Sequence, residues 1–309
     1  MKTTSGWRMM AAVLAAAVAL SWGCTRGGNE ASEGVAAALE SVVLTPEQEA
    51  QAAVEGLQAA LRAGRLADAY AMLPESYRSD IADVVSAYAG KIDADLFKMG
   101  VETLGAFGAA LSKQAENVVS LLDTMPLPFE LDGDAQAALD EAFKAGNLRL
   151  VGDWLAACPE WLDYGKLSKG DLSGLLGNAK VADFVRAAVA EGESKGAFAV
   201  RLAEQAAETA GTVMLEVGSE ADGFETFEVV KVDGRWVAKE LADEWQEGIQ
   251  KAKEAVSEFT VDEETLKKAR KMLPALKRAM ATWGESESGE ELMGNVMGTM
   301  MTLGAMAGM

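Results

Sequence analysis

Residues 224–238 read Phe-Glu-Thr-Phe-Glu-Val-Val-Lys-Val-Asp-Gly-Arg-Trp-Val-Ala, and this stretch decides the fold class. β-branched and aromatic residues flank Asp233-Gly234, and an Asp-Gly pair between two such runs is the strongest short-range signal for a β-hairpin with a type I′ turn. A further run of strand-forming residues, 213–217, precedes it. Because two strands alone would be marginally stable in water, we predict a small antiparallel sheet of about three strands whose apolar side packs on helices.

Helical periodicity lies on both sides of this sheet in the sequence. We expect a first helical block over residues 45–124 and a second over 129–210, separated by a proline-containing break. The sheet and two more helices, at 241–259 and 260–282, make up residues 211–282. The predicted fold class is mainly α with a small antiparallel β-sheet, in which a helical body is followed by a β-hairpin and C-terminal helices.

Several helix starts can be placed from their capping residues. The segment 45–48, Thr-Pro-Glu-Gln, predicts a capping box with proline at the first helical position. Asp93 is expected to cap a long helix. Thr260 and Glu263 are expected to form a second capping box, and Pro274 to kink the helix that follows.

The N-terminus has the three regions of an export signal. Lys2 and Arg8 are basic, residues 9–20 are apolar, and Gly23 is small. The apolar core has about a dozen residues, whereas a membrane-spanning helix needs roughly 20. This segment resembles the signal of bacterial lipoproteins. The resemblance implies cleavage after residue 23, lipidation of Cys24 with diacylglycerol, and anchoring to a membrane.

One position departs from the lipoprotein pattern, because Ser21 stands where that family usually has an aliphatic residue. The alternative is an ordinary signal peptide followed by an incidental cysteine. Residues 24–44 would form the lipidated N-terminus and a tether. In the bacterial lipoproteins that this segment resembles, the residue after the lipidated cysteine directs sorting, and Asp at that place is absent here because the residue is Thr25. The resemblance therefore favours the outer membrane. We therefore expect a location in the cell envelope, at the outer membrane or the periplasmic face.

Charge and cysteine content limit the partners. The chain carries 28 Lys and Arg against 48 Asp and Glu, a net charge of −20. No basic stripe is evident in the sequence, so nucleic acid is not expected as a partner, and membrane residence should come from the lipid. With Cys24 lipidated, Cys158 has no intramolecular partner, and we expect it to be a small buried core residue. A bridge between the two is the alternative if lipidation does not occur.

Two segments carry a second resemblance. Residues 61–80, Leu-Arg-Ala-Gly-Arg-Leu-Ala-Asp-Ala-Tyr-Ala-Met-Leu-Pro-Glu-Ser-Tyr-Arg-Ser-Asp, together with residues 227–245, resemble a family of uncharacterised bacterial lipoproteins. Those proteins have a helical body followed by a hairpin and an acidic, Trp-containing helix. The hairpin element is also similar to NTF2-like and cystatin-like modules. The resemblance implies the architecture and no activity, so it brings no catalytic residues.

Most enzyme signatures are missing from the sequence. The chain has no histidine, which excludes Ser-His-Asp and Cys-His catalysis and histidine-based zinc sites. It has no phosphate-binding loop and no nucleophile elbow. Asp132-Gly133-Asp134 begins like a calcium loop but lacks the later glycine and glutamate, so a helix-capping turn is expected there. We therefore predict no catalytic residues, no cofactor and no metal.

A pair of carboxylates is the remaining enzymatic possibility. Glu160 and Asp163 lie near Trp154, Trp161 and Tyr164, and a glycosidase needs two acids at a fixed separation beside a surface that can hold a sugar. The alternative is that these aromatic residues pack in a core beside solvated acids.

The C-terminal residues, 283–309, differ in composition from the rest. Acidic residues at 285–291 form a linker, and residues 292–309 carry no charge and are rich in Met and Gly. Gly294 and Gly298 have the spacing that allows close helix association. We expect this tail to pack on its own domain or to be partly disordered, with a membrane-dipping or self-associating helix as the alternative.

Taken together, these patterns predict a lipid-anchored exported protein that is a non-catalytic binding or scaffolding component of the bacterial cell envelope. Its partners would be the membrane, through the lipid, and an envelope protein. Self-association through the tail is a further possibility. The alternatives are a carboxylate-dependent hydrolase that uses Glu160 and Asp163, and a secreted protein that is never lipidated.

Overall fold

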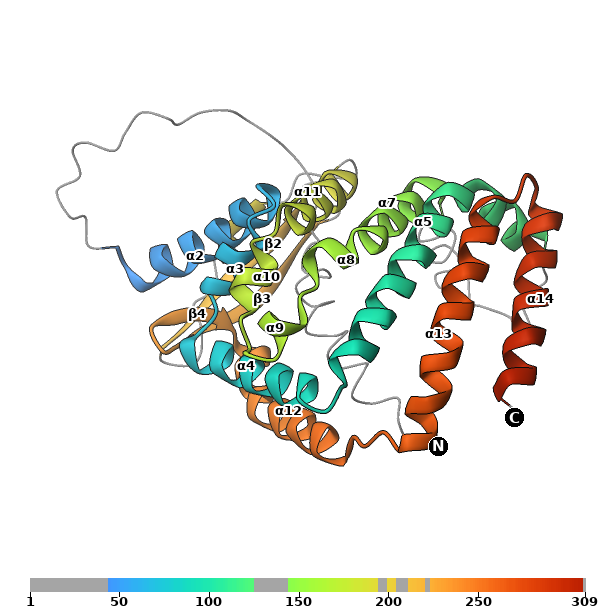
Figure 1. Cartoon of the computed structure of the whole chain (residues 1–309). Helices are drawn as coiled ribbons and strands as arrows, with labels where there is room; N and C mark the ends of the chain where they lie inside the picture. The colour runs from blue at the N-terminus through green and yellow to red at the C-terminus, as the bar shows by residue number, and fades with distance from the viewer. Residues whose placement is uncertain (1–43, 125–143, 194–198, 204–210, 220–222, 308–309) are drawn as a thin grey trace. The chain divides into compact units, whose positions relative to one another are not determined.

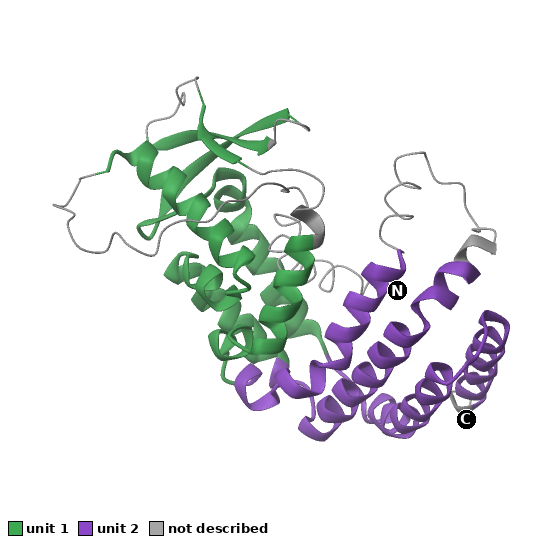
Figure 2. Ribbon diagram, turned by 90° about the horizontal axis from the view of Figure 1, so that it is seen from above, with its two compact units in different colours: residues 1–88, 169–259 green, residues 89–168, 260–309 purple. Residues whose placement is uncertain are grey.

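The computed structural model describes residues 44–124, 144–193, 199–203, 211–219 and 223–307. The described residues form two compact units, and each unit is built from two separate stretches of the chain (Figure 2). Unit 1 contains the stretch that ends at Tyr88 and residues 169–259. Unit 2 contains residues 89–168 and the stretch that begins at Thr260. The predicted fold class, mainly α with a small antiparallel sheet, is confirmed.

Unit 1 combines helices with the sheet. Its elements are α2 (Pro46–Arg62), α3 (Leu66–Ala71), α4 (Glu75–Ala89), α10 (Leu172–Leu176), α11 (Ala179–Glu193), β1 (Ala199–Leu202), β2 (Thr212–Ser219), β3 (Gly223–Val232), β4 (Arg235–Ala238) and α12 (Lys239–Glu258).

The sheet is a meander in the order β1-β2-β3-β4, with every neighbouring pair antiparallel. The predicted hairpin joins β3 to β4. Asp233 and Gly234 both have positive φ, 47° and 75°, as a type I′ turn requires. The prediction of about three strands was wrong by one, because β1 lies at residues 199–202, where the second helical block was expected. Four residues are too few for a period to be read from the sequence.

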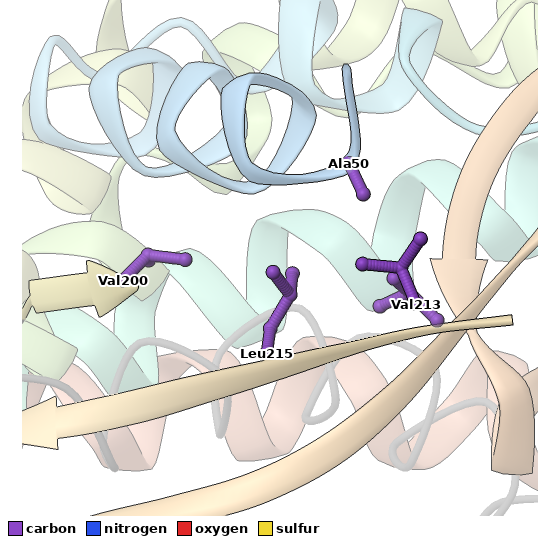
Figure 3. Packing of buried hydrophobic residues seen from close by; sticks show 5 residues of the cluster. Ala50, Val200, Val213 and Leu215 are labelled. Atoms are coloured by element: carbon purple, nitrogen blue, oxygen red, sulfur yellow. The ribbon is translucent and has the colours of Figure 1, made fainter. Parts of the chain in front are cut away.

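Helices cover both faces of the sheet, where the sequence led us to expect one. On one face, Val200, Val213 and Leu215 point toward α2 and pack against Ala50 (Figure 3). Because successive strand residues point to opposite faces, Val230 next to the core residue Val229 faces the other way. It packs there with residues of α4 and α12. Unit 1 is therefore a three-layer arrangement of helix, sheet and helices.

The helix starts show where capping chemistry was predicted correctly. Thr45 forms the expected capping box at the start of α2, and the Asp93 carboxylate accepts a hydrogen bond from the Leu96 amide, 2.9 Å. The second capping box was wrong. The N-cap of the helix that follows is Asp262, whose carboxylate accepts from the backbone N–H of Thr265 at 2.7 Å.

Unit 2 is helical throughout its described part. Its elements are α5 (Ala94–Thr124), α7 (Ala145–Ala156), α8 (Cys158–Trp161), α9 (Tyr164–Leu167), α13 (Glu263–Gly284) and α14 (Gly289–Ala307). The long helix α5 packs against α7 and α13, and α14 packs against α13 and α5 (Figure 1). The helix α13 runs continuously through Pro274.

Small residues let the helices of unit 2 approach closely. A Cβ atom placed on Gly108 of α5 would lie 2.3 Å from the backbone nitrogen of Ala156, and one on Gly152 of α7 would lie 2.5 Å from that of Ser112. The α5–α7 crossing therefore requires glycine on both helices. Less than two turns further along α5, the buried Gln114 donates hydrogen bonds to the carbonyls of Gly284 and Ser286, which satisfies acceptors left over where α13 ends.

Candidate functional site

The predicted lipidation site, Cys24, lies outside the described residues, as do residues 1–23 and most of the tether. Lipidation therefore stays a prediction. In the parts of the chain that the structure covers, none of the helices combines the length and the apolar character needed to cross a membrane.

The residues of the hydrolase alternative lie in unit 2, from the last turn of α7 through the short helices α8 and α9. The indoles of Trp154 and Trp161 stack on each other at 5.6 Å between ring centroids, and both side chains are partly buried. Tyr164 donates a hydrogen bond to the carbonyl of Ile92, 2.9 Å. Glu160 is exposed. The aromatic side chains therefore pack within the unit, as the alternative interpretation of these residues expected.

Asp163 has a structural task. Its carboxylate accepts a hydrogen bond from the Lys166 amide at 2.8 Å and so caps α9. Other acids at helix starts do the same: Asp93 caps α5, Asp171 caps α10 and Asp262 caps α13. Carboxylates at these positions satisfy backbone amides that have no partner inside the helix. Asp163 thus belongs to a pattern of capping that recurs in both units.

Cys158 is buried, as expected from the sequence, with 1% of its surface exposed. It is a free thiol that donates to the carbonyl of Trp154, with Sγ 3.7 Å from the oxygen. Burial raises the pKa of Cys158 to about 11. The thiol is therefore protonated at neutral pH, and it lacks the thiolate character of a catalytic nucleophile.

The two segments that carry the family resemblance contact one another in unit 1. The ring of Tyr77 stacks on Trp245 at 3.8 Å with an interplanar angle of 9°. The indole N–H of Trp245 donates to Asp80, 3.1 Å, and the ammonium of Lys253 donates to the other oxygen of that carboxylate, 2.8 Å. Burial alone would raise the pKa of Asp80, but these two hydrogen bonds outweigh it and lower the pKa.

A further contact joins the same two segments. The carboxylate of Asp233 in the hairpin turn accepts a hydrogen bond from the Ser76 amide at 3.0 Å. Ser76 lies in the first turn of α4, where a negative charge is favourable. The resemblance therefore rests on residues that pack the hairpin and α12 against α4, which is a structural role.

A different kind of surface occurs on α13 and α14 in unit 2. Trp283 of α13 donates a hydrogen bond to Thr299 of α14, 3.1 Å, and Asn295 of α14 donates one to Ser286 in the turn between the helices, 3.0 Å. Between them runs an open groove of about 400 Å³, with Ala275 on the α13 side. Most of its other lining residues are small or polar, among them Thr282, Gly294, Gly298 and Thr302, and Trp283 and Leu303 are the large ones.

A row of methionines lies beside this groove. Met297, Met300 and Met301 of α14 are 54%, 68% and 73% exposed. Their spacing places them on one side of the helix, and Met301 lies about one turn after Gly298 of the groove. Large exposed apolar side chains grouped in this way mark interaction surfaces more often than isolated ones do.

A row of basic residues lies on α13. Lys267, Lys271 and Arg278 are exposed and lie close to one line along the helix, and within the described parts of the chain none of them forms an ion pair. Other basic residues of α13 do have partners, because Arg270 pairs with Asp93 and Lys277 with Glu102 of α5. We call the six residues of the two rows the outer α13–α14 face.

Sequence reasoning missed this face. The methionine spacing of three and four residues is visible in the sequence, whereas the prediction for this tail rested on the spacing of its glycines. The basic row is regular on its own helix, and only the packing of α13 on α14 brings the two helices together. That packing is tertiary information.

Neither a metal site nor a known relative assigns a function to the chain. Within the residues that the structure covers, no group of three or more His, Cys, Asp or Glu side chains is placed to hold a metal ion. A comparison of the chain with models of protein families, with curated proteins and with solved structures found no match.

Proposed function

We propose that this chain is a lipid-anchored, non-catalytic binding or scaffolding protein of the bacterial cell envelope, with the outer α13–α14 face as its binding surface. Cys24 carries the lipid in this proposal, and the residues after it form the tether. Two or three acyl chains hold a protein stably on a membrane, whereas one gives marginal binding.

The observation that carries the binding role is the exposure of Met297, Met300 and Met301 on a regular helix. Methionine is flexible and polarizable, and it is used at surfaces that adapt to a partner. Leaving three such side chains in water forgoes the free energy that burying them would supply, about 25 cal/mol per Å² of apolar surface. A partner would recover that free energy.

The proposal that the protein is not a catalyst is supported by the structural roles of two side chains that could otherwise react. The Cys158 thiol is buried with a raised pKa, and Asp163 caps a helix. The hydrolase that would use Glu160 and Asp163 has less support, because its aromatic residues pack on each other. That alternative requires Glu160→Gln and Asp163→Asn each to abolish hydrolysis of an envelope glycan by the purified protein.

The lipid is tested in cells by growth with labelled palmitate, followed by membrane fractionation and intact-mass measurement. We expect label and membrane association for the natural chain and neither for Cys24→Ser. Ser21→Leu is a useful comparison, because it restores the usual lipoprotein pattern and should leave the product unchanged or increase its yield. A natural chain without label, or one whose first residue is not a modified cysteine, would refute the anchor.

A further inference from the structure

We infer that Met297, Met300 and Met301 form a reversible oxidation site, at which a peroxide converts their thioethers to sulfoxides and so changes the exposed side of α14 from apolar to polar. The biological use of this change, control of partner binding, rests on the proposed function. The oxidation and the change of surface do not, because both can be measured on the chain without a partner.

The three methionines are the most exposed large apolar side chains in the described part of the chain. They are 54% to 73% exposed, whereas the other large apolar residues that reach the solvent, such as Leu104 and Leu241, are 37% to 42% exposed. Met280 of α13 is buried, with 7% exposed. Because oxidation of a methionine requires access to its sulfur, a peroxide reaches the row on α14 before it reaches Met280.

The composition of α14 makes these three sulfur atoms decisive for the polarity of its exposed side. After Glu291, the other exposed residues whose side chains the structure describes on this helix are glycines, Ala305 and Thr302. Glycine and alanine offer little or no side chain, and the Thr302 hydroxyl donates to the carbonyl of Gly298 in its own helix, 2.9 Å. The thioethers are therefore the main groups that this side of the helix presents to a partner.

The reaction needs a peroxide and nothing else from outside the chain. The sulfur lone pair attacks one oxygen of hydrogen peroxide, so that an S–O bond forms and the O–O bond breaks. The proton on the transferred oxygen passes to the departing hydroxide, which leaves as water. Sulfur loses two electrons and the peroxide gains two. Methionine sulfoxide reductases reverse the change, because two thiols become a disulfide while the sulfoxide oxygen leaves as water.

The product opposes binding at this surface. A sulfoxide is polar where the thioether was apolar, and it disrupts contacts that are rich in methionine. A partner that covers the row then has to remove water from three sulfoxide oxygens, which is unfavourable unless each finds a hydrogen-bond donor. Binding through the row should therefore weaken on oxidation and recover on reduction.

The Cys158 thiol does not compete for the oxidant. Thiols react as thiolates, and Cys158 is buried with a pKa raised to about 11. A thioether has no proton to lose, so it reacts readily at neutral pH. Cys158 is the one cysteine within the described residues. The exposed methionines are therefore the first sulfur groups that an oxidant meets in that part of the chain.

The packing of α14 does not use the atoms that would be oxidised. Leu292, which is 5% exposed, lies on the other side of the helix. Thr299 accepts a hydrogen bond from Trp283, and Asn295 donates one to Ser286. Sulfoxides on the solvent side leave these contacts in place. Oxidation should therefore change the surface of the helix without unfolding it, and this makes the change reversible.

The first test measures which methionines react. It uses the mature chain with Cys24→Ser, because neither a thiol nor the thioether of a lipid is then present at that position. After timed exposure to hydrogen peroxide, peptide mass mapping gives the oxidation of each methionine. Met300 and Met301 should oxidise about tenfold faster than Met280, or more, with Met297 between them and Met280. Equal rates for Met280 and Met301 overturn the inference.

The second test measures the surface by retention on a phenyl column. The Cys24→Ser chain should elute earlier after oxidation and return to its first position after treatment with a methionine sulfoxide reductase. A triple variant with Met297→Leu, Met300→Leu and Met301→Leu keeps the apolar surface without the thioethers, and its retention should hardly respond to peroxide. Met280→Leu is the matched control, because it removes a buried thioether, and it should respond as the Cys24→Ser chain does.

Three results overturn the inference in this second test. They are retention of the Cys24→Ser chain that oxidation leaves unchanged, a triple leucine variant that loses as much retention as that chain, and loss of the helical circular dichroism signal on oxidation, because the change is then unfolding. Failure of the proposed function gives a different result. If the face binds no partner, replacing the three methionines by glutamate leaves the crosslinked neighbours of the protein in cells unchanged, while selective oxidation and the retention shift still support the inference.

Discussion

Unit 1 and unit 2 reach stability by opposite means. In unit 1, large side chains from distant parts of the sequence fill the space around a sheet, as Leu215 does in the core and Trp245 does against Asp80. In unit 2, small residues allow helix backbones to touch, as Gly108 and Gly152 do. Unit 1 should therefore lose most stability when a buried side chain is made smaller, and unit 2 when a glycine between helices is made larger.

The largest effect is expected from a truncation in unit 1. Leu215 is fully buried between the sheet and α2. Leu215→Ala should lower the free energy of unfolding by about 2–5 kcal/mol, because the apolar contacts are lost and a cavity remains. Chemical denaturation followed by circular dichroism measures this. Leu241→Ala, at a partly exposed site of α12, should cost far less, and equal losses would contradict the description of the core.

An enlargement in unit 2 should have the next largest effect. Gly108→Ala adds a Cβ atom 2.3 Å from the backbone of α7, which forces the two helices apart at a cost of about 1–3 kcal/mol. Gly100→Ala, on the same helix, meets no atom within 4 Å and should stabilise the protein by up to about 1 kcal/mol. Thermal unfolding of the two variants should therefore shift in opposite directions. Shifts in the same direction would contradict the close packing of α5 and α7.

The polar contact of unit 1 gives a smaller, pH-dependent effect. The pKa of Asp80 is lowered in the folded protein, so its ionised form stabilises the fold above the unfolded pKa of about 4, and this contribution is lost as pH falls through the folded pKa. Asp80→Asn keeps an acceptor for Trp245 but loses the charge that pairs with Lys253. We expect it to cost about 1 kcal/mol at pH 7 and almost nothing near pH 2.

Glu247→Gln is the control for that measurement. Glu247 pairs with Lys251 one turn along α12, and both side chains are largely exposed. Such pairs contribute little because water screens them. If Glu247→Gln and Asp80→Asn had equal effects at pH 7, the contact between α4 and α12 would be no stronger than a surface ion pair.

The parts of the fold that were predicted from the sequence are those set by local chemistry. Asp233 and Gly234 determine their turn by backbone preference, and Thr45 forms its capping box within four residues. The predictions that were wrong concern features that depend on tertiary contacts. The strand β1 forms because Val200 can pair opposite Val217 and pack on α2.

At the start of α13, two nearby residues could each have served as the N-cap. Thr260 and Asp262 both have side chains suited to an N-cap, and the carboxylate nearer the helix takes the position, where its charge also interacts with the helix dipole. For the candidate site, the methionine spacing is a local signal. That α13, with its basic row, packs on α14 is a tertiary contact, which no local pattern specifies.

The smallest effect is expected from a cap in unit 2, where the polar contact is local and not long-range. Asp163 bonds an amide three residues away, whereas Asp80 bonds residues 165 and 173 positions away. Asp163→Ala should lower the free energy of unfolding by about 0.5–1 kcal/mol, and Asp163→Asn by a few tenths, because asparagine is an equally good N-cap. Thermal unfolding measures both. A catalytic carboxylate behaves in the opposite way, because Asp163→Asn would remove its charge and abolish activity while the fold is unchanged. The two variants therefore separate a capping role from a catalytic one.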